Sequence, residues 1–128
     1  MRGGAVGNGD LFVMRDPTGI RPCHMPVTDQ VIAFASERVP LMTVFEASED
    51  QVQALDPGSV VTVKADGSLS AGQFAKPRTY LPCSFEKIYF SRGNDPQIYR
   101  ERKAMGAALV SQVVEAVGGP LENAVFSF

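Results

Sequence analysis

Two stretches decide the fold of this chain: GDLFVMRDPTGIRPC at residues 9–23 and PCSFEKIYFSRGND at residues 82–95. Each sets a short apolar run beside a turn that carries an arginine. The run at 11–14 is long enough for a buried strand and too short for a helix, and DPTG at 16–19 is a turn sequence. The aromatic-rich run at 84–91 is also predicted to be a strand. Both stretches therefore indicate a sheet-based fold.

The middle of the chain predicts further strands and one short helix. The run at 31–35 is almost wholly apolar, which is typical of a strand covered on both faces. A short helix over 36–45 is predicted to follow it. The runs at 60–65 and 68–72 flank an Asp-Gly pair at 66–67, which is favoured in type I′ turns. This segment is therefore predicted to be a β-hairpin.

The longest predicted element is a helix that begins at Asp95, a typical N-cap, with Pro96 in the first helical position. Apolar residues then recur from Ile98 at spacings of three, four and seven, which predicts one apolar stripe along a helix of roughly 20 residues. The glycines at 118–119 end it. Residues 124–128 resemble the beginning of a strand, and we expect the chain to be a piece of a longer protein.

Composition indicates a soluble globular protein. The chain has 128 residues, of which 45% are hydrophobic and 20% charged, enough for one domain with its own core. A net charge of −2 with scattered Lys and Arg argues against a nucleic-acid partner. No apolar run approaches the roughly 18 residues of a membrane span, so no membrane partner is expected. The first ten residues lack the apolar centre of a secretory signal. Two cysteines form no disulfide framework, which favours a cytoplasmic location.

Five motifs in order along the chain resemble glutamine phosphoribosylpyrophosphate amidotransferases, also called amidophosphoribosyltransferases. They are DPTGIRP at 16–22, ASE at 35–37, DPG at 56–58, FEKIYFSR at 85–92 and a Tyr99-x-x-Arg102-x-x-x-Gly106 pattern. None is decisive alone, but their order and spacing together resemble the family over nearly the whole chain. The chain departs from the family at Cys23, where an aliphatic residue is usual, and at Arg92-Gly93, where Arg-Pro is usual.

The resemblance implies an α+β fold: the second half of an N-terminal-nucleophile glutaminase domain, which is an αββα sandwich of mostly antiparallel sheets, plus a long connecting helix. Residues 1–8 would be a flexible segment and 9–93 the C-terminal part of the glutaminase-like domain. Residues 94–128 would be the connecting helix and first strand of a phosphoribosyltransferase-like domain. Because such a piece leaves sheet edges and an apolar face uncovered, we expect a homo-oligomer or pairing with further chain.

The resemblance also implies a function for the parent protein. Members of the family hydrolyse glutamine with an N-terminal cysteine nucleophile. The ammonia then passes through an internal channel to convert phosphoribosylpyrophosphate to phosphoribosylamine, with Mg²⁺, in purine synthesis. Glutamine and phosphoribosylpyrophosphate would be the substrates of this glutamine-dependent phosphoribosyltransferase of the glycosyltransferase class. The family's catalytic residues lie outside the matching segment, so we expect no catalytic residue, no cofactor and no activity in this chain alone.

Two other functions fit the sequence. A non-catalytic dimerisation or regulatory module derived from the sandwich is the main alternative, since it needs none of the missing catalytic residues. A piece of a different amidotransferase, such as glucosamine-phosphate or asparagine synthetase, fits less well, because the junction between the YFSR run and the long helix is not expected there.

Five residues are singled out as candidate site positions. By resemblance, Tyr89 approaches the ammonia channel, although a tyrosine of a core or interface is the favoured alternative. Arg92 is a candidate contact to the transferase domain or to an anion, against a plain surface arginine. Cys83 stands where some relatives bind an iron–sulfur cluster, but a cluster needs four ligands, so an inert buried thiol is favoured. Asp16 and Arg21 are predicted to be structural, capping and bracing their own turn.

Overall fold

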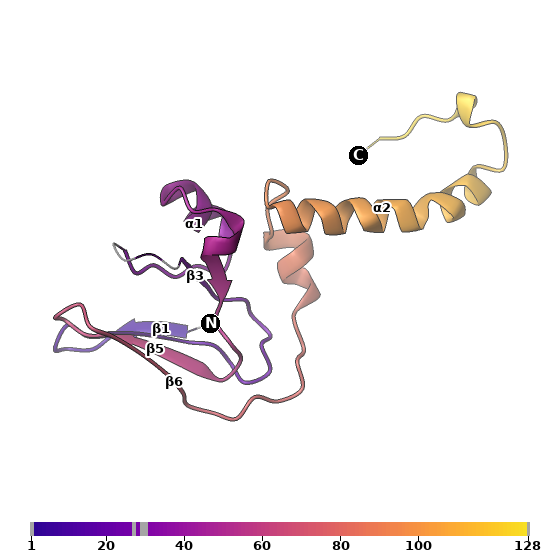
Figure 1. Ribbon diagram of the computed structural model, residues 1–128. Helices are drawn as coiled ribbons and strands as arrows, with labels where there is room; N and C mark the ends of the chain where they lie inside the picture. The colour runs from indigo at the N-terminus through magenta and orange to yellow at the C-terminus, as the bar shows by residue number, and fades with distance from the viewer. Residues whose placement is uncertain (1, 27, 29–30, 128) are drawn as a thin grey trace.

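The computed structural model describes residues 2–26, 28 and 31–127. Two small antiparallel sheets and helix α1 lie at one end of the molecule, and helix α2 extends outward from them (Figure 1). The elements at that end are β1 (Arg2–Ala5), β2 (Leu11–Met14), β3 (His24–Pro26), α1 (Arg38–Val44), the 3₁₀ turn η1 (Glu49–Gln51), β4 (Val52–Ala54), β5 (Ser59–Val63) and β6 (Leu69–Gln73). The expectation of mostly antiparallel strands with a long helix is confirmed.

The larger sheet has the strand order β1-β2-β5-β6, with every neighbouring pair antiparallel. Val61 lies on β5, which has a strand on each side, and its side chain is fully buried. The predicted strand at 11–14 is β2. The segment 1–8 contributes β1, because the edge of β2 offers it a row of hydrogen-bond partners.

The predicted hairpin is formed by β5 and β6, but its turn is of another type. A type I′ turn needs positive φ at both central residues, and here Gly67 has a φ of 84° whereas Asp66 does not have a positive φ. Lys64 N donates to the Ser68 carbonyl at 2.9 Å, and Gly67 N donates to the Lys64 carbonyl at 2.9 Å. This is a three-residue loop with glycine in the left-handed position, the next commonest hairpin connection.

The smaller sheet pairs β3 with β4 and packs against α1. A buried apolar cluster of Leu41, Ala47 and Val52 joins the helix to this sheet. The helix covers residues 38–44 and is shorter at both ends than predicted. Its N-cap is Glu37, whose side chain makes no capping hydrogen bond. The packing of Leu41 therefore holds the helix where a side-chain cap is lacking.

The prediction of a strand at 31–35 is wrong for these residues. The structure shows a single bridge, in which Ala35 and His24 exchange backbone hydrogen bonds of 2.8 and 3.0 Å. Val31 and Ile32 are each 39% exposed. An apolar run becomes a two-sided strand only where strands and covering layers flank it, and among the described residues none flanks this run beyond Ala35.

Residues 84–91 are also predicted to be a strand, but 84–90 are helical. A helical turn leads into the π-helix η2 (Glu86–Phe90), which closes with a 2.8 Å hydrogen bond from Ser91 N to the Glu86 carbonyl. The composition favours a strand, but the apolar side chains also follow the i, i+3, i+4 spacing of a helix: Phe85, Ile88 and Tyr89. Strand propensity largely reports packing against neighbouring strands, and the described residues offer this segment no sheet edge.

Helix α2 (Pro96–Val117) begins and ends as predicted. Asp95 accepts hydrogen bonds from the first free amides, and Gly118 ends the helix with a φ of 61°. The predicted apolar stripe is present, but it packs against nothing in the described chain: beyond Glu101 every residue of the helix is exposed. After it come the 3₁₀ turn η3 (Leu121–Asn123) and irregular chain at 124–127 in place of the predicted strand. No helix of the described residues is long and apolar enough to span a membrane.

Candidate functional site at the base of helix α2

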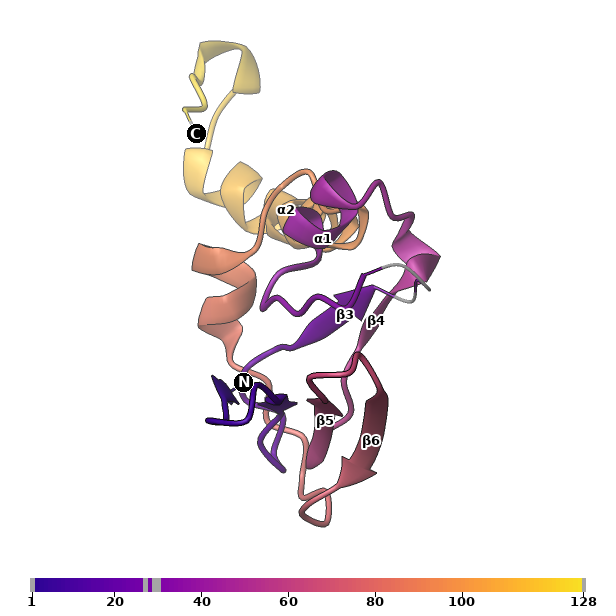
Figure 2. The same cartoon turned by 90° about the vertical axis from the view of Figure 1, so that its left-hand side faces the viewer.

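The candidate site is a cleft of about 260 Å³ between two parts of the chain. We call residues 2–26 and 31–75 the body, and residues 84–117, which form η2 and α2, the arm. The loop between them runs along the turn of the body, with Leu81 N donating to the Thr18 carbonyl at 2.9 Å. Figure 2 shows the first turn of α2 beside α1, so the cleft lies where the arm meets the body.

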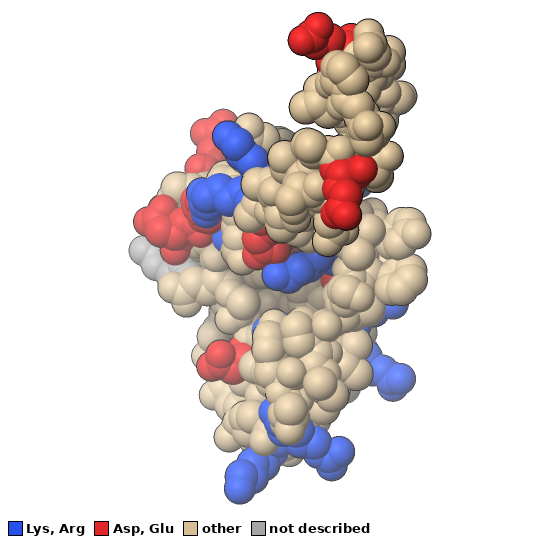
Figure 3. All heavy atoms as spheres, turned by 90° about the vertical axis from the view of Figure 1, so that its right-hand side faces the viewer, with Lys and Arg blue, Asp and Glu red and all other residues tan. Residues whose placement is uncertain are grey.

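Side chains from both parts line the cleft, and most of them are polar or charged. The body contributes His24, Glu37 and Arg38, and the arm contributes Glu86, Asp95 and Gln97. Acidic and basic side chains lie beside one another on the upper part of the face in Figure 3, whereas basic side chains alone extend from its lowest end. Such a mixed surface favours intrachain ion pairs over one strongly charged ligand.

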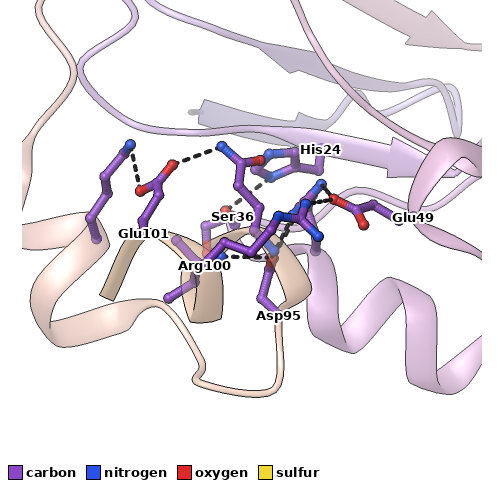
Figure 4. Close-up of polar contacts among 10 residues, drawn as sticks. His24, Ser36, Glu49, Asp95, Arg100 and Glu101 are labelled. Carbon is purple, nitrogen blue, oxygen red and sulfur yellow. Dashed lines mark hydrogen bonds and ion pairs between the residues drawn. The ribbon is translucent and has the colours of Figure 1, made fainter. Parts of the chain in front are cut away.

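The strongest contact across the cleft is the ion pair of Arg38 with Asp95. Arg38 Nε donates to Asp95 Oδ2 at 2.9 Å, and Arg38 Nη2 donates to Oδ1 in the parallel arrangement typical of bidentate pairs. The side chains are only 12% and 7% exposed. Asp95 also accepts from the amides of Gln97 and Ile98, so one carboxylate both caps α2 and holds it to α1 (Figure 4).

The protonation states of this pair follow from its surroundings. The hydrogen bond to Asp95 raises the pKa of Arg38 above its ordinary value. Burial pushes the pKa of Asp95 upward, but the hydrogen bonds from Arg38 and from the helix amides outweigh burial and leave that pKa lowered. Both groups therefore stay charged at neutral pH.

Two further ion pairs join the arm to the body, and both are more exposed. Glu49 lies 2.9 Å from Arg100 Nη2 and 3.6 Å from Arg38 Nη1, as Figure 4 shows for Glu49 and Arg100. Arg21 Nη1 lies 2.6 Å from Glu86, whose side chain is buried while that of Arg21 is exposed. Since exposed pairs contribute little, the Arg38–Asp95 pair is the main polar link.

Within the arm, η2 is fixed to α2 by side chains of the helix. Arg102 Nη2 donates to the carbonyl of Ser91 at 3.1 Å and of Ile88 at 3.3 Å. Lys87 pairs with Glu101 at 2.9 Å. These contacts satisfy carbonyls at the end of η2 that no longer have helical partners, so η2 and the first turns of α2 form one unit.

Glu37 has the least complete hydrogen bonding and ion pairing of the charged side chains described in the cleft. Its Oε1 atom is buried and has no hydrogen-bond partner among the described residues. Burial raises the pKa of Glu37, and the nearby carboxylates of Glu86 and Asp95 raise it further, while Arg92 lowers it. Three carboxylates from three elements thus converge here, and only two of them are paired with an arginine.

His24 contributes a hydrogen bond rather than a reactive group. Its Nδ1 lies 3.1 Å from the Ser36 carbonyl oxygen, which can only accept, so Nδ1 carries the proton. Burial lowers the pKa of His24, which favours the neutral ring. The imidazole thereby fixes the chain just before α1 against β3.

The two cysteines do not form a reactive centre. Cys23 is fully buried and burial raises the pKa of its thiol, whereas Cys83 is half-buried at the edge of the cleft. The described residues contain no group of three or more His, Cys, Asp or Glu side chains that could hold a metal ion. An iron–sulfur cluster at Cys83 would need its other ligands from outside this segment, so that role stays a prediction.

The turn at 16–19 is held by Asp16 and by an arginine that the sequence does not single out. Asp16 Oδ2 accepts from Thr18 Oγ1 at 2.8 Å and from Ile20 N at 2.9 Å. The bracing role expected of Arg21 is filled by Arg15, which is 6% exposed. Arg15 donates to the carbonyls of Leu55 at 2.6 Å and Arg21 at 3.1 Å, while Arg21 itself turns outward to Glu86.

The other predicted site residues lie near the cleft but do not form it. Tyr89 is 71% exposed and stacks on Phe85 with ring centroids 5.0 Å apart. Arg92 is exposed next to Ser91. Both roles predicted from the resemblance stay predictions. Of the residues that do form the site, Glu37 belongs to the ASE motif at 35–37, whereas Arg38 carries no recognisable motif, because its partner Asp95 comes from a distant part of the chain.

Comparison with known proteins shows similarity to amidophosphoribosyltransferases. The chain is 33% identical over 117 residues to that of Pasteurella multocida, covering 84% of this chain and 22% of the relative. It is 32% identical over 127 residues to that of Haemophilus influenzae, covering 92% and 24%, and 30% identical over 117 residues to that of Escherichia coli, covering 84% and 22%. The chain thus spans less than a quarter of the length of these relatives.

A solved structure agrees with the sequence comparison. The structure of glutamine phosphoribosylpyrophosphate amidotransferase from B. subtilis, complexed with ADP and GMP, matches with a TM-score of 0.55 at 27% identity. The match covers 66% of this chain and 18% of that chain. No profile of a known protein family matches. The mixed fold described above is therefore similar to that of amidotransferases of this kind.

Proposed function

We propose that the chain is a segment of an amidophosphoribosyltransferase-like enzyme of purine biosynthesis. The observation that carries this proposal is the similarity to the named relatives, which extends over 84–92% of the chain at 30–33% identity. The whole protein would use ammonia derived from glutamine to convert phosphoribosylpyrophosphate to phosphoribosylamine. Its Mg²⁺ and its catalytic residues would lie outside this segment, so the segment alone would have no activity.

In this proposal the body and η2, up to residue 93, are the later part of a glutaminase-like domain, and α2 connects them to the transferase-like domain. The body supplies part of an αββα sandwich, and its four-stranded sheet would pair or pack with strands of the remaining protein. The cleft between body and arm then lies on the boundary of the two activities, near residue 93. Tyr89 and Arg92 are proposed contacts of that boundary.

A non-catalytic interaction module is the second candidate function. It is favoured by the exposed apolar surface of α2, since large apolar surfaces of this kind are typical of interfaces. In this role the segment would dimerise or bind a regulated partner, and the likeness to an enzyme would reflect only a shared scaffold.

The two functions are separated by the size and the activity of the native protein. An antibody against this chain is used to find the size of the polypeptide that carries it in cells. A polypeptide several times larger than 13.8 kDa that releases pyrophosphate from phosphoribosylpyrophosphate only with glutamine or ammonia supports the enzyme. A larger polypeptide without that activity, or a polypeptide of 13.8 kDa, supports the module.

A further inference from the structure

The hydrogen bonds and ion pairs between the arm and the body, among the described residues, lie at the base of the arm. Among the described residues, the hydrogen bonds and ion pairs that join α2 and its cap to the body come from Asp95 and Arg100. From residue 102 to the end of the helix, every residue is exposed. The direction of a helix of 22 residues is therefore set by contacts within its first turns.

The interface between body and arm differs from the cores of the parts themselves. The body has its own apolar cluster around Leu41, whereas the interface holds ion pairs around a cleft of about 260 Å³. Polar interfaces of this kind are typical of parts that move relative to each other. Packed apolar interfaces, in contrast, fix one arrangement because they are close-packed.

We propose that Arg38 and Asp95 form the latch of a hinge between the body and the arm. In the structure the latch is closed, and both of its side chains line the cleft. When the pair separates, the cleft opens and α2 changes direction about the chain near residue 84, where the backbone hydrogen bonds that tie residues 78, 81 and 83 to the body end. A molecule bound in the cleft would therefore act on the latch, and through the latch on the direction of α2.

The geometry explains why one pair has this effect. Arg38 lies on the first turn of α1 and Asp95 is the cap of α2, so the pair joins two helices directly. Both side chains are largely buried, and removing one partner of such a pair shifts an equilibrium by roughly a hundredfold or more. The more exposed Arg100–Glu49 pair, on the same helix, provides a matched comparison.

The latch is tested by measuring the distance between the body and the arm in the full chain. Spin labels are attached to Ser70→Cys on β6 and Gln112→Cys on α2, both exposed, in a Cys83→Ser background, and the distance distribution is measured by pulsed electron paramagnetic resonance. We expect one narrow distribution in this parent. Asp95→Ser removes the ion pair but keeps a good N-cap, so it should give a broad distribution with unchanged helix content by circular dichroism.

Two other variants make the result decisive. Arg100→Gln breaks the exposed pair and should leave the distribution as narrow as in the parent. Arg38→Gln breaks the ion pair and leaves the cap of α2 intact. If Asp95→Ser lowers the helix content, the distance distribution of Arg38→Gln is used instead to test the latch. The proposal is overturned if the parent is already broad, if Arg38→Gln stays narrow, or if Arg100→Gln broadens the distribution equally. Any role of the latch in catalysis rests on the proposed function. The distance measurement requires no enzymatic activity, so the latch and the proposed function can be disproved independently.

Discussion

The body and the arm are built from equally apolar sequence, but they use it differently. In the body, apolar residues of β5 and α1 find partners within the chain, and Val61 and Leu41 are buried. In the arm, the apolar residues of α2 and the aromatic residues of η2 remain exposed, and charged side chains make the contacts. The comparison shows that an apolar sequence alone does not bury an element, because burial requires a partner that packs against it.

The largest expected effect compares the same substitution in the two parts. Leu41→Ala in the body should lower the free energy of unfolding by about 2 to 5 kcal/mol, because it removes buried methyl groups and leaves a cavity. Leu109→Ala on the exposed face of α2 should change it by no more than about 0.5 kcal/mol. Urea unfolding followed by circular dichroism measures both. Equal losses would show that α2 is packed in solution, contrary to the structure.

The second prediction compares two arginines on either side of the turn at 16–19. Arg15→Met should cost about 2 to 4 kcal/mol of unfolding free energy, because it leaves buried carbonyls without the charged donor that satisfies them. Arg21→Met should cost less, about 1 to 2 kcal/mol, because its own side chain is exposed although the buried Glu86 carboxylate loses its cation. Thermal unfolding of the two variants under one set of conditions makes the comparison. The reverse order would restore to Arg21 the bracing role that the sequence suggests.

The third prediction separates a crowded glycine from an open one. Gly58 and Gly67 both have positive φ, but a Cβ on Gly58 would lie 2.2 Å from the Ala75 carbonyl oxygen, whereas nothing lies within 4 Å at Gly67. Gly67→Ala should therefore cost only the backbone strain, about 1 kcal/mol, and Gly58→Ala clearly more. The difference is measured as the shift in the urea midpoint. Similar midpoints would mean that the Gly58 turn relaxes without cost.

Elements that depend on local sequence could be predicted, and those that depend on distant partners could not. The cap at Asp95, the end of α2 at Gly118 and the β5–β6 hairpin follow from residues next to one another in the chain. The prediction of a strand at 84–91 was wrong because an aromatic-rich composition fits a strand and a helix alike. The absence of a neighbouring sheet edge decides between the two. The prediction of a strand at 31–35 was wrong for the same reason, since these residues have no flanking strands beyond one bridge.

The residues of the candidate site could likewise be predicted only where their partners are close in sequence. The sequence marks Asp16 because its partners lie within five residues. It does not mark Arg38, whose partner Asp95 lies 57 residues away, or Arg15, which reaches Leu55 across 40 residues. A buried arginine has no sequence pattern of its own. It is found only when the fold shows which carbonyl or carboxylate it satisfies.

The smallest expected effect concerns the charge balance between body and arm. Glu37 faces Glu86 on η2, Asp95 at the cap of α2 and Arg92 between them, and its pKa is raised above 4.5. Because the folded state then binds a proton more tightly than the unfolded state, Glu37 stabilises the fold below its ordinary pKa. That contribution is lost as the pH rises through the raised value. Asp95, whose pKa is lowered, acts in the opposite sense and loses its contribution as the pH falls.

Glu37→Gln should therefore remove the part of the stability loss that occurs as the pH rises from 4.5 toward neutrality. The free energy of unfolding is measured by urea titration across this range, with Glu115→Gln on the exposed face of α2 as control. The control should keep the slope of the parent, because its carboxylate is surrounded by water. If Glu37→Gln also keeps that slope, then the three carboxylates do not repel one another across the cleft. The joint between body and arm would in that case depend on the Arg38–Asp95 pair without any opposing charge.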